Sequence, residues 1–370
     1  MKASGQFRQV WGIGMLKTSL PARVRRFFLA LLLLMTSFGA WAQCSGTVQT
    51  IPITLPSSVS VPRDLPAGAM LTDWISSPSN SALWSCTAYG VVAGSVEMIG
   101  SLSTPSGTTI SWGGKTYTVW NTNLSGVGIA IAFSSYLEFG GCGFGWGGWG
   151  SATSSWGFGW GCSNANGVSP IGGRAMVALV KTSNTATLGG TISGATVLKT
   201  APYYNGVKTA LADSFVITPV TVVPMSCTTP NVNVPMGTFK TTDFPTVGSL
   251  SPGAAAPVNI QLVNCPAGTA DPNSQGGQIH SVQYSITPSA GTVATNVAAL
   301  SGSPSATGVG IQLFDPSGAV LPLSTPQTVS GYDGTVGGNY TIPLTARYYR
   351  TGTVTAGPAN TTMTVTLSYQ

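Results

Sequence analysis

The sequence predicts an all-β protein built from two β-sandwich domains; the pattern of residue types predicts the strands, and two features of composition add to this prediction. Short runs rich in Val, Ile, Thr and Tyr alternate with Gly, Pro, Asn and Ser, and no capped helical period follows residue 42. Charged residues make up only 6% of the chain, which suits a subunit whose surface is largely covered by neighbours. Six cysteines follow residue 42, an even number that predicts three disulfides in an oxidising compartment. Proximity along the chain predicts the pairs Cys44–Cys86, Cys142–Cys162 and Cys227–Cys265.

The first 42 residues have the pattern of a secretory signal peptide. Three arginines precede an apolar run over 27–38, and residues 40–42 read Ala-Trp-Ala before Gln43. The run is too short to cross a membrane, and no later segment approaches the length of apolar sequence that a transmembrane helix needs. We therefore expect residues 1–42 to be a leader for export, and the chain from Gln43 onward to have no membrane span.

The basic character of the chain comes from this leader. Six of the 15 basic residues and none of the nine acidic ones precede Gln43, so the mature chain carries no net charge. Nucleic-acid binding needs a clustered basic face and is not expected. No metal site or cofactor is expected, because there is no Cys-x-x-Cys spacing and His280 is the only histidine.

An enzyme is not expected either. The N-terminal half, 43–224, has no histidine, and no motif brings two of its acidic residues together for acid–base work. Those acidic residues are Asp64, Asp73, Glu97, Glu138 and Asp213.

The C-terminal half contains the clearest strand signals. Runs of alternating apolar and polar residues, or runs rich in β-formers, lie at 257–263, 282–286, 308–314, 340–348 and 363–369. Evenly spaced strands of this kind predict a β-sandwich.

The last of these strands has one apolar face. That face consists of Met363, Val365, Leu367 and Tyr369. Side chains alternate across a strand, so this side must be buried. No later segment is present in the sequence to cover the strand's outer edge, and an unpaired apolar edge invites pairing with another chain. Either the strand pairs internally in a complete sandwich, or the fold borrows a strand from elsewhere.

Several motifs of this half, in the right order, resemble those of a fimbrial pilin domain. They are Cys227 with Val-Pro-Met-Gly at 234–237, Cys265 at the end of a strand, and the runs 308–313, 342–349 and 365–369. The resemblance covers about 226–370. It implies an immunoglobulin-like sandwich that lacks its last strand, with Cys227 and Cys265 bridged.

The resemblance also implies partners and a location. A periplasmic chaperone would lend a strand beside the terminal one, and at the outer-membrane usher the next fimbrial subunit would replace it with its own N-terminal extension. Met363, Val365, Leu367 and Tyr369 would then face the groove that the donor strand fills. The chain would pass through the periplasm to the fimbrial tip at the cell surface.

The N-terminal half is long enough for a domain of its own. A linker with two prolines is expected over 218–225, which gives domains at 43–224 and 225–370. No donor segment is visible before the pilin motifs, so the subunit is expected at the end of a polymer, where a binding domain is useful. In architecture, with Cys44 near the N-terminus and Cys86 as its partner, this half resembles the lectin domain of two-domain fimbrial adhesins such as the type 1 mannose-binding one. The acidic mannose pocket of that family has no match here.

A segment rich in glycine and tryptophan is the main candidate for ligand contact. The pentapeptide Gly-Phe-Gly-Trp-Gly occurs at 143–147 and 157–161, each copy beside a cysteine. A hairpin bridged from Cys142 to Cys162 would place Trp146 opposite Phe158 and all its aromatic side chains on one face. The candidate residues are Phe144, Trp146, Trp149, Trp156, Phe158 and Trp160.

Two uses fit such an aromatic face. It can stack on the apolar faces of sugar rings, or it can pack into the sandwich core, which is the commoner fate of aromatic residues. The expected function is therefore a fimbrial tip adhesin that binds a glycan. The alternatives are a capping subunit without a receptor and an adhesin for a protein or lipid.

Other polar residues are weaker candidates for ligand contact. Asn and Asp in such sequences usually make turns rather than bind sugars. The residues concerned are Asp73, Asn80, Asn121, Asn123, Asn164, Asn166 and the expected mature N-terminus, Gln43.

Overall fold

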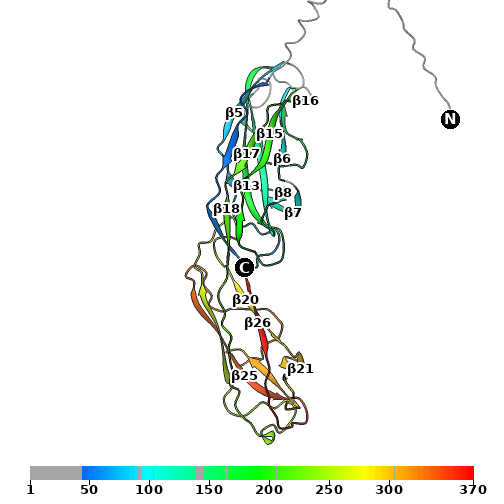
Figure 1. The fold of residues 1–370 in the computed structure, drawn as a ribbon, viewed down its shortest axis with the longest axis vertical. Coiled ribbons are helices and arrows are strands. Elements are labelled where there is room, and N and C mark those ends of the chain that lie inside the picture. The colour runs from blue at the N-terminus through cyan, green and yellow to red at the C-terminus, as the bar shows by residue number, and fades with distance from the viewer. Residues whose placement is uncertain are drawn as a thin grey trace, which may run out of the picture. The chain divides into compact units, whose positions relative to one another are not determined.

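The computed structural model describes residues 44–89, 93–102, 104–138, 145–162, 166–204, 207–303 and 305–370. The expected signal peptide and Gln43 lie outside these residues, as do Cys142, Phe144 and Asn164. Residues Cys44–Gln370 form one compact unit (Figure 1). Within the described part this unit consists of strands and one short 3₁₀ helix, η1 (Thr241–Asp243), which confirms the all-β fold class. No helix in the described part is long and apolar enough to cross a membrane.

Three sheets form the N-terminal half. The largest runs in the order β1 (Cys44–Ser45), β5 (Asn80–Tyr89), β13 (Asn166–Lys181), β9 (Val127–Leu137), β8 (Lys115–Asn121) and β7 (Pro105–Trp112). Beside this path, β4 (Ile75–Ser76) pairs with β13, and both β10 (Gly145–Trp146) and β11 (Gly150–Ser151) pair with β9. The second sheet runs β12 (Gly157–Cys162), β6 (Ala93–Gly100), β15 (Ala195–Tyr204), β17 (Asp213–Ile217) and β2 (Thr50–Ile53), with β16 (Val207–Lys208) on β15. The third runs β14 (Gly190–Ile192), β18 (Val220–Met225) and β3 (Ser58–Pro62).

The central pair of this half is β9 with β13. Both strands are long apolar runs, and their antiparallel register extends from Ile171 opposite Leu137 to Lys181 opposite Val127. Odd-numbered residues of β9 face the core between the first two sheets, where Phe133 meets Phe215 of β17 with ring centroids 5.8 Å apart. Even-numbered residues therefore face outward.

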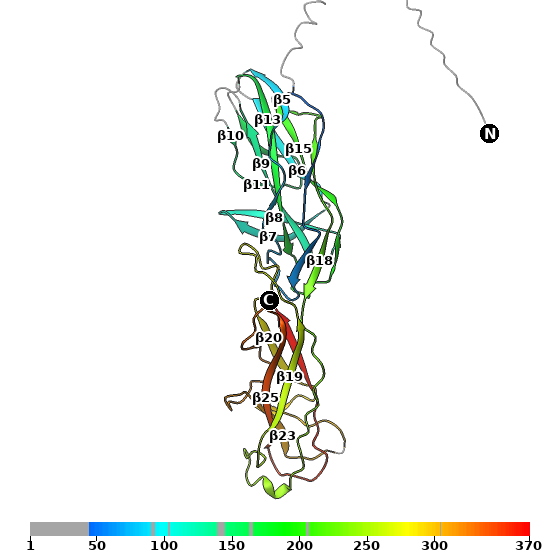
Figure 2. The same cartoon turned by 90° about the vertical axis from the view of Figure 1, so that its left-hand side faces the viewer.

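The outward face is itself partly covered. The hairpin of β7 and β8 curls over it and encloses a second, smaller core. Its buried residues are Ile110, Tyr117, Val119, Ala130, Ala132, Met176 and Val180, with Met70, Trp74 and Trp149 packed against them. Figure 2 shows β7, β8, β10 and β11 on the same side of this half, next to β9.

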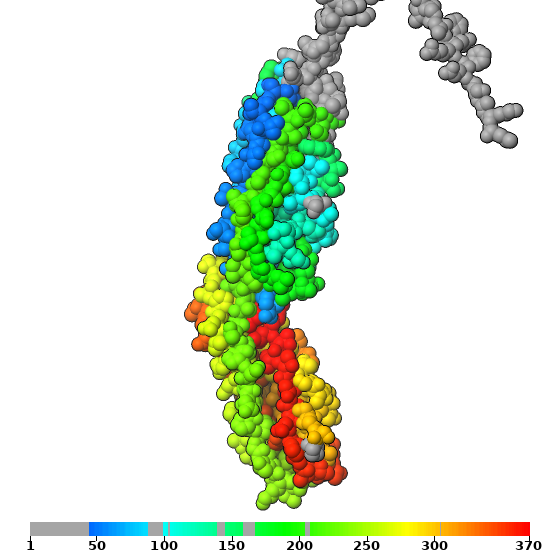
Figure 3. Space-filling view, in the orientation of Figure 1, coloured from blue at the N-terminus to red at the C-terminus, as the bar shows by residue number. Residues whose placement is uncertain are grey.

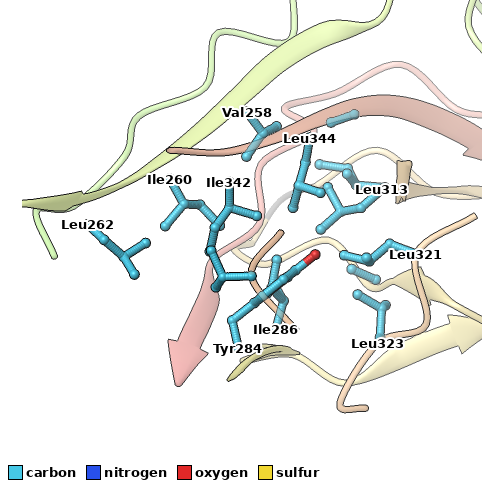
Figure 4. Packing of buried hydrophobic residues seen from close by; sticks show 14 of the residues in the cluster. Val258, Ile260, Leu262, Tyr284, Ile286, Leu313, Leu321, Leu323, Ile342 and Leu344 are labelled. Atoms are coloured by element: carbon cyan, nitrogen blue, oxygen red, sulfur yellow. The ribbon is translucent and has the colours of Figure 1, made fainter. Parts of the chain in front are cut away.

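Two further sheets form the C-terminal half, and none of their strands comes from the N-terminal half. One sheet runs β19 (Ala256–Cys265), β25 (Gly338–Arg350), β23 (Val309–Phe314), β22 (Val297–Ala298) and β21 (Thr292–Ala294). The other runs β24 (Gln327–Thr328), β20 (Val282–Pro288) and β26 (Met363–Tyr369). Alternate residues of both sheets meet in a core of Val, Ile and Leu around Tyr284 (Figure 4). The sheets thus pack as the sandwich that the alternating sequence predicts.

Two disulfides are present in the described residues. One joins Cys44 to Cys86 between β1 and β5, with Cα atoms 4.0 Å apart. The other joins Cys227 to Cys265 at the end of β19, with Cα atoms 4.2 Å apart. Both pairs are those that proximity in the sequence predicts. The third expected pair includes Cys142 and so lies outside the described residues.

Candidate functional sites: an aromatic surface and an open strand edge

Four side chains on the outward face of β9 and β13 form a continuous cluster, here called the aromatic–arginine surface. It consists of Tyr136, Trp146, Trp149 and Arg174. Trp146 of β10 lies directly opposite Tyr136 of β9, with ring centroids 5.3 Å apart in an edge-to-face arrangement. The Arg174 guanidinium carbon lies 4.3 Å from the ring centroid of Trp146 and 4.8 Å from that of Trp149. All four side chains are partly exposed.

The backbone around this surface is held in place by hydrogen bonds. The Ser134 hydroxyl donates to the Gly147 carbonyl at 2.7 Å, and the Gly147 N–H donates to the Ser135 carbonyl at 2.8 Å. Beneath the surface, Gly172 lies so close to the start of β5 that an added Cβ would stand 2.1 Å from the Asn80 carbonyl oxygen. Trp146 and Trp149 therefore project from a segment fixed against β9.

The polar groups of the surface are unevenly satisfied. The Arg174 Nε is buried and has no hydrogen-bond acceptor among the described residues. The Tyr136 hydroxyl donates to the Glu138 carboxylate at 2.8 Å, and this bond raises the pKa of Tyr136 above its ordinary value. The Lys115 ammonium donates to the Trp149 carbonyl at 2.7 Å. The surface thus combines partly exposed rings with a cation held against two of them.

The structure contradicts the hairpin that the repeated pentapeptide predicts. Trp146 pairs with Tyr136 in the first sheet, whereas Phe158 pairs with Glu97 of β6 in the second sheet. The physical reason is that the glycines have no side chains to fix a pairing partner, so the free edges of β9 and β6 can each accept one copy.

The predicted aromatic candidates are accordingly separated. Trp146 and Trp149 belong to the aromatic–arginine surface, while Trp156 lies under the Lys208 ammonium, 4.5 Å from its ring centroid. Phe144 lies outside the described residues, and so do the side chains of Phe158 and Trp160. Tyr136 and Arg174 were missed. An arginine within the otherwise apolar run 171–180 is the sequence signal that could have drawn attention to the second.

The weaker polar candidates make bonds within the protein. Asn80 accepts from the Ala82 N–H at 2.9 Å, as a turn residue does. Asn121 donates to Thr104. The Asn123 side chain donates to the Thr191 carbonyl and accepts from the Ser193 N–H. Asp73 accepts from its neighbour Trp74 at 2.7 Å and from Asn273 at 2.9 Å. The side chain of Asn166 is not among those described.

The second candidate site is the outer edge of β26. This strand pairs with β20 on one side, and within the described residues no strand pairs with its other edge. Met363, Val365 and Leu367 pack against the C-terminal core yet stay partly exposed, whereas Tyr369 is 1% exposed. Figure 3 shows β26, in red, at the surface of the half. The predicted apolar alternation is present, and the edge has the free backbone groups that an added strand needs.

The comparisons with known proteins address this half of the chain. Residues 217–370 match the family described as Fimbrial protein. The chain is 35% identical over 139 residues to the fimbrial subunit type 1 of Klebsiella pneumoniae, which covers 37% of this chain and 70% of that protein. It is 45% identical over 78 residues to the type-1 fimbrial protein A chain of Escherichia coli (strain K12), which covers 20% of this chain. This second match spans only 42% of the length of that relative.

The family follows from these sequence relatives. A solved structure, the CupB6 tip adhesin from Pseudomonas aeruginosa, is also similar, with a TM-score of 0.34 and 13% identity over 88% of this chain and 93% of that one. The Klebsiella match, which extends over more than two thirds of its partner, shows that the chain belongs to the fimbrial protein family. The protein is a fimbrial subunit.

Proposed function

We propose that this fimbrial subunit is a two-domain tip adhesin, with a receptor-binding domain at 43–224 and a pilin domain at 225–370. The open edge of β26 is the observation that carries the proposal, because it can accept a strand. After export directed by residues 1–42, a periplasmic chaperone covers this edge. At the outer-membrane usher, the next subunit then replaces the chaperone's strand with its own.

The aromatic–arginine surface is the proposed contact for a host or surface glycan. Ring faces such as that of Trp146 can stack on the apolar face of a sugar, while the Arg174 guanidinium donates to sugar oxygens. One observation supports this use over a purely structural one: the four side chains remain partly exposed.

A glycan array probed with the full exported chain tests the ligand. The parent is expected to bind at least one glycan, and a folded Trp146→Ala variant should bind it about tenfold more weakly, the effect of losing one stacking side chain. Trp112→Ala is the matched control, because Trp112 is 38% exposed and its ring contacts are with Trp74 and Tyr117 rather than with Trp146. A folded parent that binds no glycan would favour a capping role or a protein or lipid receptor.

Co-expression with periplasmic chaperones of chaperone–usher systems tests the strand edge. Val365→Asp should abolish co-purification, because it places a charge on the partly buried face that a donor strand would cover. Thr364→Asp is the control, since Thr364 faces away from the core and is exposed. Equal recovery of the chaperone with both variants would contradict strand acceptance.

A further inference from the structure

The free backbone groups of β26 can be assigned one by one. Ser281 and Gln370 exchange two hydrogen bonds, of 2.9 and 3.0 Å, on the side that faces β20. In an antiparallel pair the N–H and C=O of one residue point to the same side, and successive residues alternate. The even-numbered residues of β26 therefore bond to β20. Met363, Val365, Leu367 and Tyr369 direct their backbone groups to the outer edge.

The N-terminal half occupies the last part of that edge. The Tyr369 N–H donates to the Asp64 carboxylate at 3.0 Å, and the Asp64 N–H donates to the Tyr369 carbonyl at 3.0 Å. The Arg63 guanidinium donates to the Leu367 carbonyl at 2.9 Å. Two residues that follow β3 thus satisfy three backbone groups of β26 in the way that a neighbouring strand would.

These two residues are themselves firmly held. The Arg63 N–H donates to the Met225 carbonyl at 3.2 Å, and its carbonyl accepts from the Thr187 N–H at 2.7 Å. The Arg63 side chain forms an ion pair with Asp64 at 2.9 Å and lies over the Tyr369 ring, 5.0 Å from its centroid. The Tyr369 hydroxyl donates to the Cys227 carbonyl at 3.2 Å. An incoming strand would have to displace Asp64 from this anchored position to pair with the backbone of Tyr369.

We propose that Arg63 and Asp64 form a stop that limits the paired length of the incoming strand. The partner that fits is an extended segment of another subunit, bonded to Met363, Val365 and the Leu367 N–H, and ending beside Asp64. At about 3.4 Å per residue, this stretch takes roughly five residues of the donor. This proposal depends on the proposed acceptance of a strand by β26. It adds that the pairing of the incoming strand ends at Arg63 and Asp64.

Amide hydrogen exchange of the full exported chain, read residue by residue, tests the Asp64 bond without any ligand. In the parent, the Tyr369 amide should exchange more slowly than the Val365 amide. In Asp64→Ala it should exchange about ten to a hundred times faster than in the parent, the worth of a hydrogen bond to a charged acceptor. A Tyr369 amide that exchanges equally fast in the parent and the variant overturns the stop.

Synthetic peptides test the length limit. The probes alternate valine with lysine, have blocked ends and are about five, seven and nine residues long. With the parent, affinity should level off once the peptide covers Met363 to Leu367. With Asp64→Ala, each further backbone bond should strengthen binding about fivefold. Should Asp64→Ala fail to fold, Arg63→Gln replaces it, and the gain is then expected at the Leu367 carbonyl alone.

The possible results separate the two proposals. Peptides that bind neither protein overturn strand acceptance, and the stop with it. Peptides that bind both proteins with the same dependence on length overturn the stop alone. Asp243→Ala is the matched control, because Asp243 also accepts a backbone N–H, that of Lys240 at 2.8 Å, but makes no bond to β26. It should behave like the parent in both experiments.

Discussion

The two halves of this fimbrial subunit differ in how far their strand edges are covered by other strands. In the N-terminal half, short glycine-rich strands cover long edges: β10 and β11 pair with β9, and β12 pairs with β6. In the C-terminal half, β26 has one edge that pairs with no strand of the described residues and is hydrogen-bonded at one end by Arg63 and Asp64. An uncovered edge exposes a monomer to unwanted pairing with other chains, whereas in a polymer it can pair with a strand of the neighbouring subunit. On the proposed function, the N-terminal half is self-sufficient and the C-terminal half is completed by a strand of another chain.

The largest effect is expected from a substitution in the core of the N-terminal half. Phe133 is 2% exposed and packs edge-to-face on Phe215 across the two sheets. Phe133→Ala should lower the free energy of unfolding by about 3–5 kcal/mol, through lost burial and a cavity. Thermal unfolding measures it. Trp112→Ala, which removes a more exposed ring, should cost far less, and equal losses would refute the assigned core.

The two disulfides allow a matched comparison of the halves. Cys227–Cys265 closes 38 residues of chain and Cys44–Cys86 closes 42, so each should contribute about 4 kcal/mol by the entropy of loop closure. Replacing either pair with serines and measuring denaturant unfolding checks this. Because the C-terminal half lacks strand cover, its variant should show the lower midpoint. The reverse order would contradict the proposed difference between the halves.

A smaller effect is expected at the aromatic–arginine surface. Arg174→Gln removes a cation from two tryptophan rings and should cost about 1–2 kcal/mol in unfolding free energy. Arg174→Lys retains the charge but not the planar group that stacks, so it should recover only part of the stability and of any glycan affinity. Full recovery by lysine would show that charge alone matters at this position.

The smallest effect concerns pH at a second contact between the halves. Asp271 accepts N–H groups from Asn273 and Asp73, and the bond from Asn273 is the main reason why its pKa lies below the ordinary value for aspartate. A lowered folded-state pKa gives stability that is present above the unfolded pKa and is lost as pH falls through the folded one. Acidification below about pH 4 should therefore lower the protection of the Gln275 amide against exchange, measured relative to its intrinsic rate at the same pH; this amide donates to the Met70 carbonyl.

Removing the titrating group provides the control for that experiment. In Asp271→Asn, the Gln275 amide should be less protected at neutral pH, and its protection relative to the intrinsic rate should show little further change on acidification. An acid response of the same size in parent and variant would assign the effect to another group.

The sequence was most informative where a single period determines the structure. Alternation in 257–263 and 363–369 predicted β19 and β26 because one face of each strand is buried. The cysteine pairs 44–86 and 227–265 followed from proximity alone. The choice of pairing partner for the glycine-rich copies could not be predicted in this way. Glycine has no side chain to specify a face, so the edges of β9 and β6 decided where each copy lies.

The candidate site shows the same limit. Tryptophan content drew attention to Trp146 and Trp149, which do lie together. Tyr136 and Arg174 join them only through the β9–β13 register, which places Ser134 opposite Arg174 and Tyr136 opposite Gly172. Such non-local juxtaposition has no signature within a short window of sequence. For the same reason, the contact of Arg63 and Asp64 with β26 was not anticipated.

The bond between Asp64 and Tyr369 also has a consequence for the timing of folding. It joins residues separated by 305 positions, so it can form only after both halves of the chain have been made and brought together. Contacts of such high sequence separation are slow to form, because a long loop must be closed first. The segment that carries Arg63 and Asp64 is therefore synthesised long before its partner strand exists. Docking of the two halves through this bond is therefore a late step in folding, and it requires that β26 has already formed.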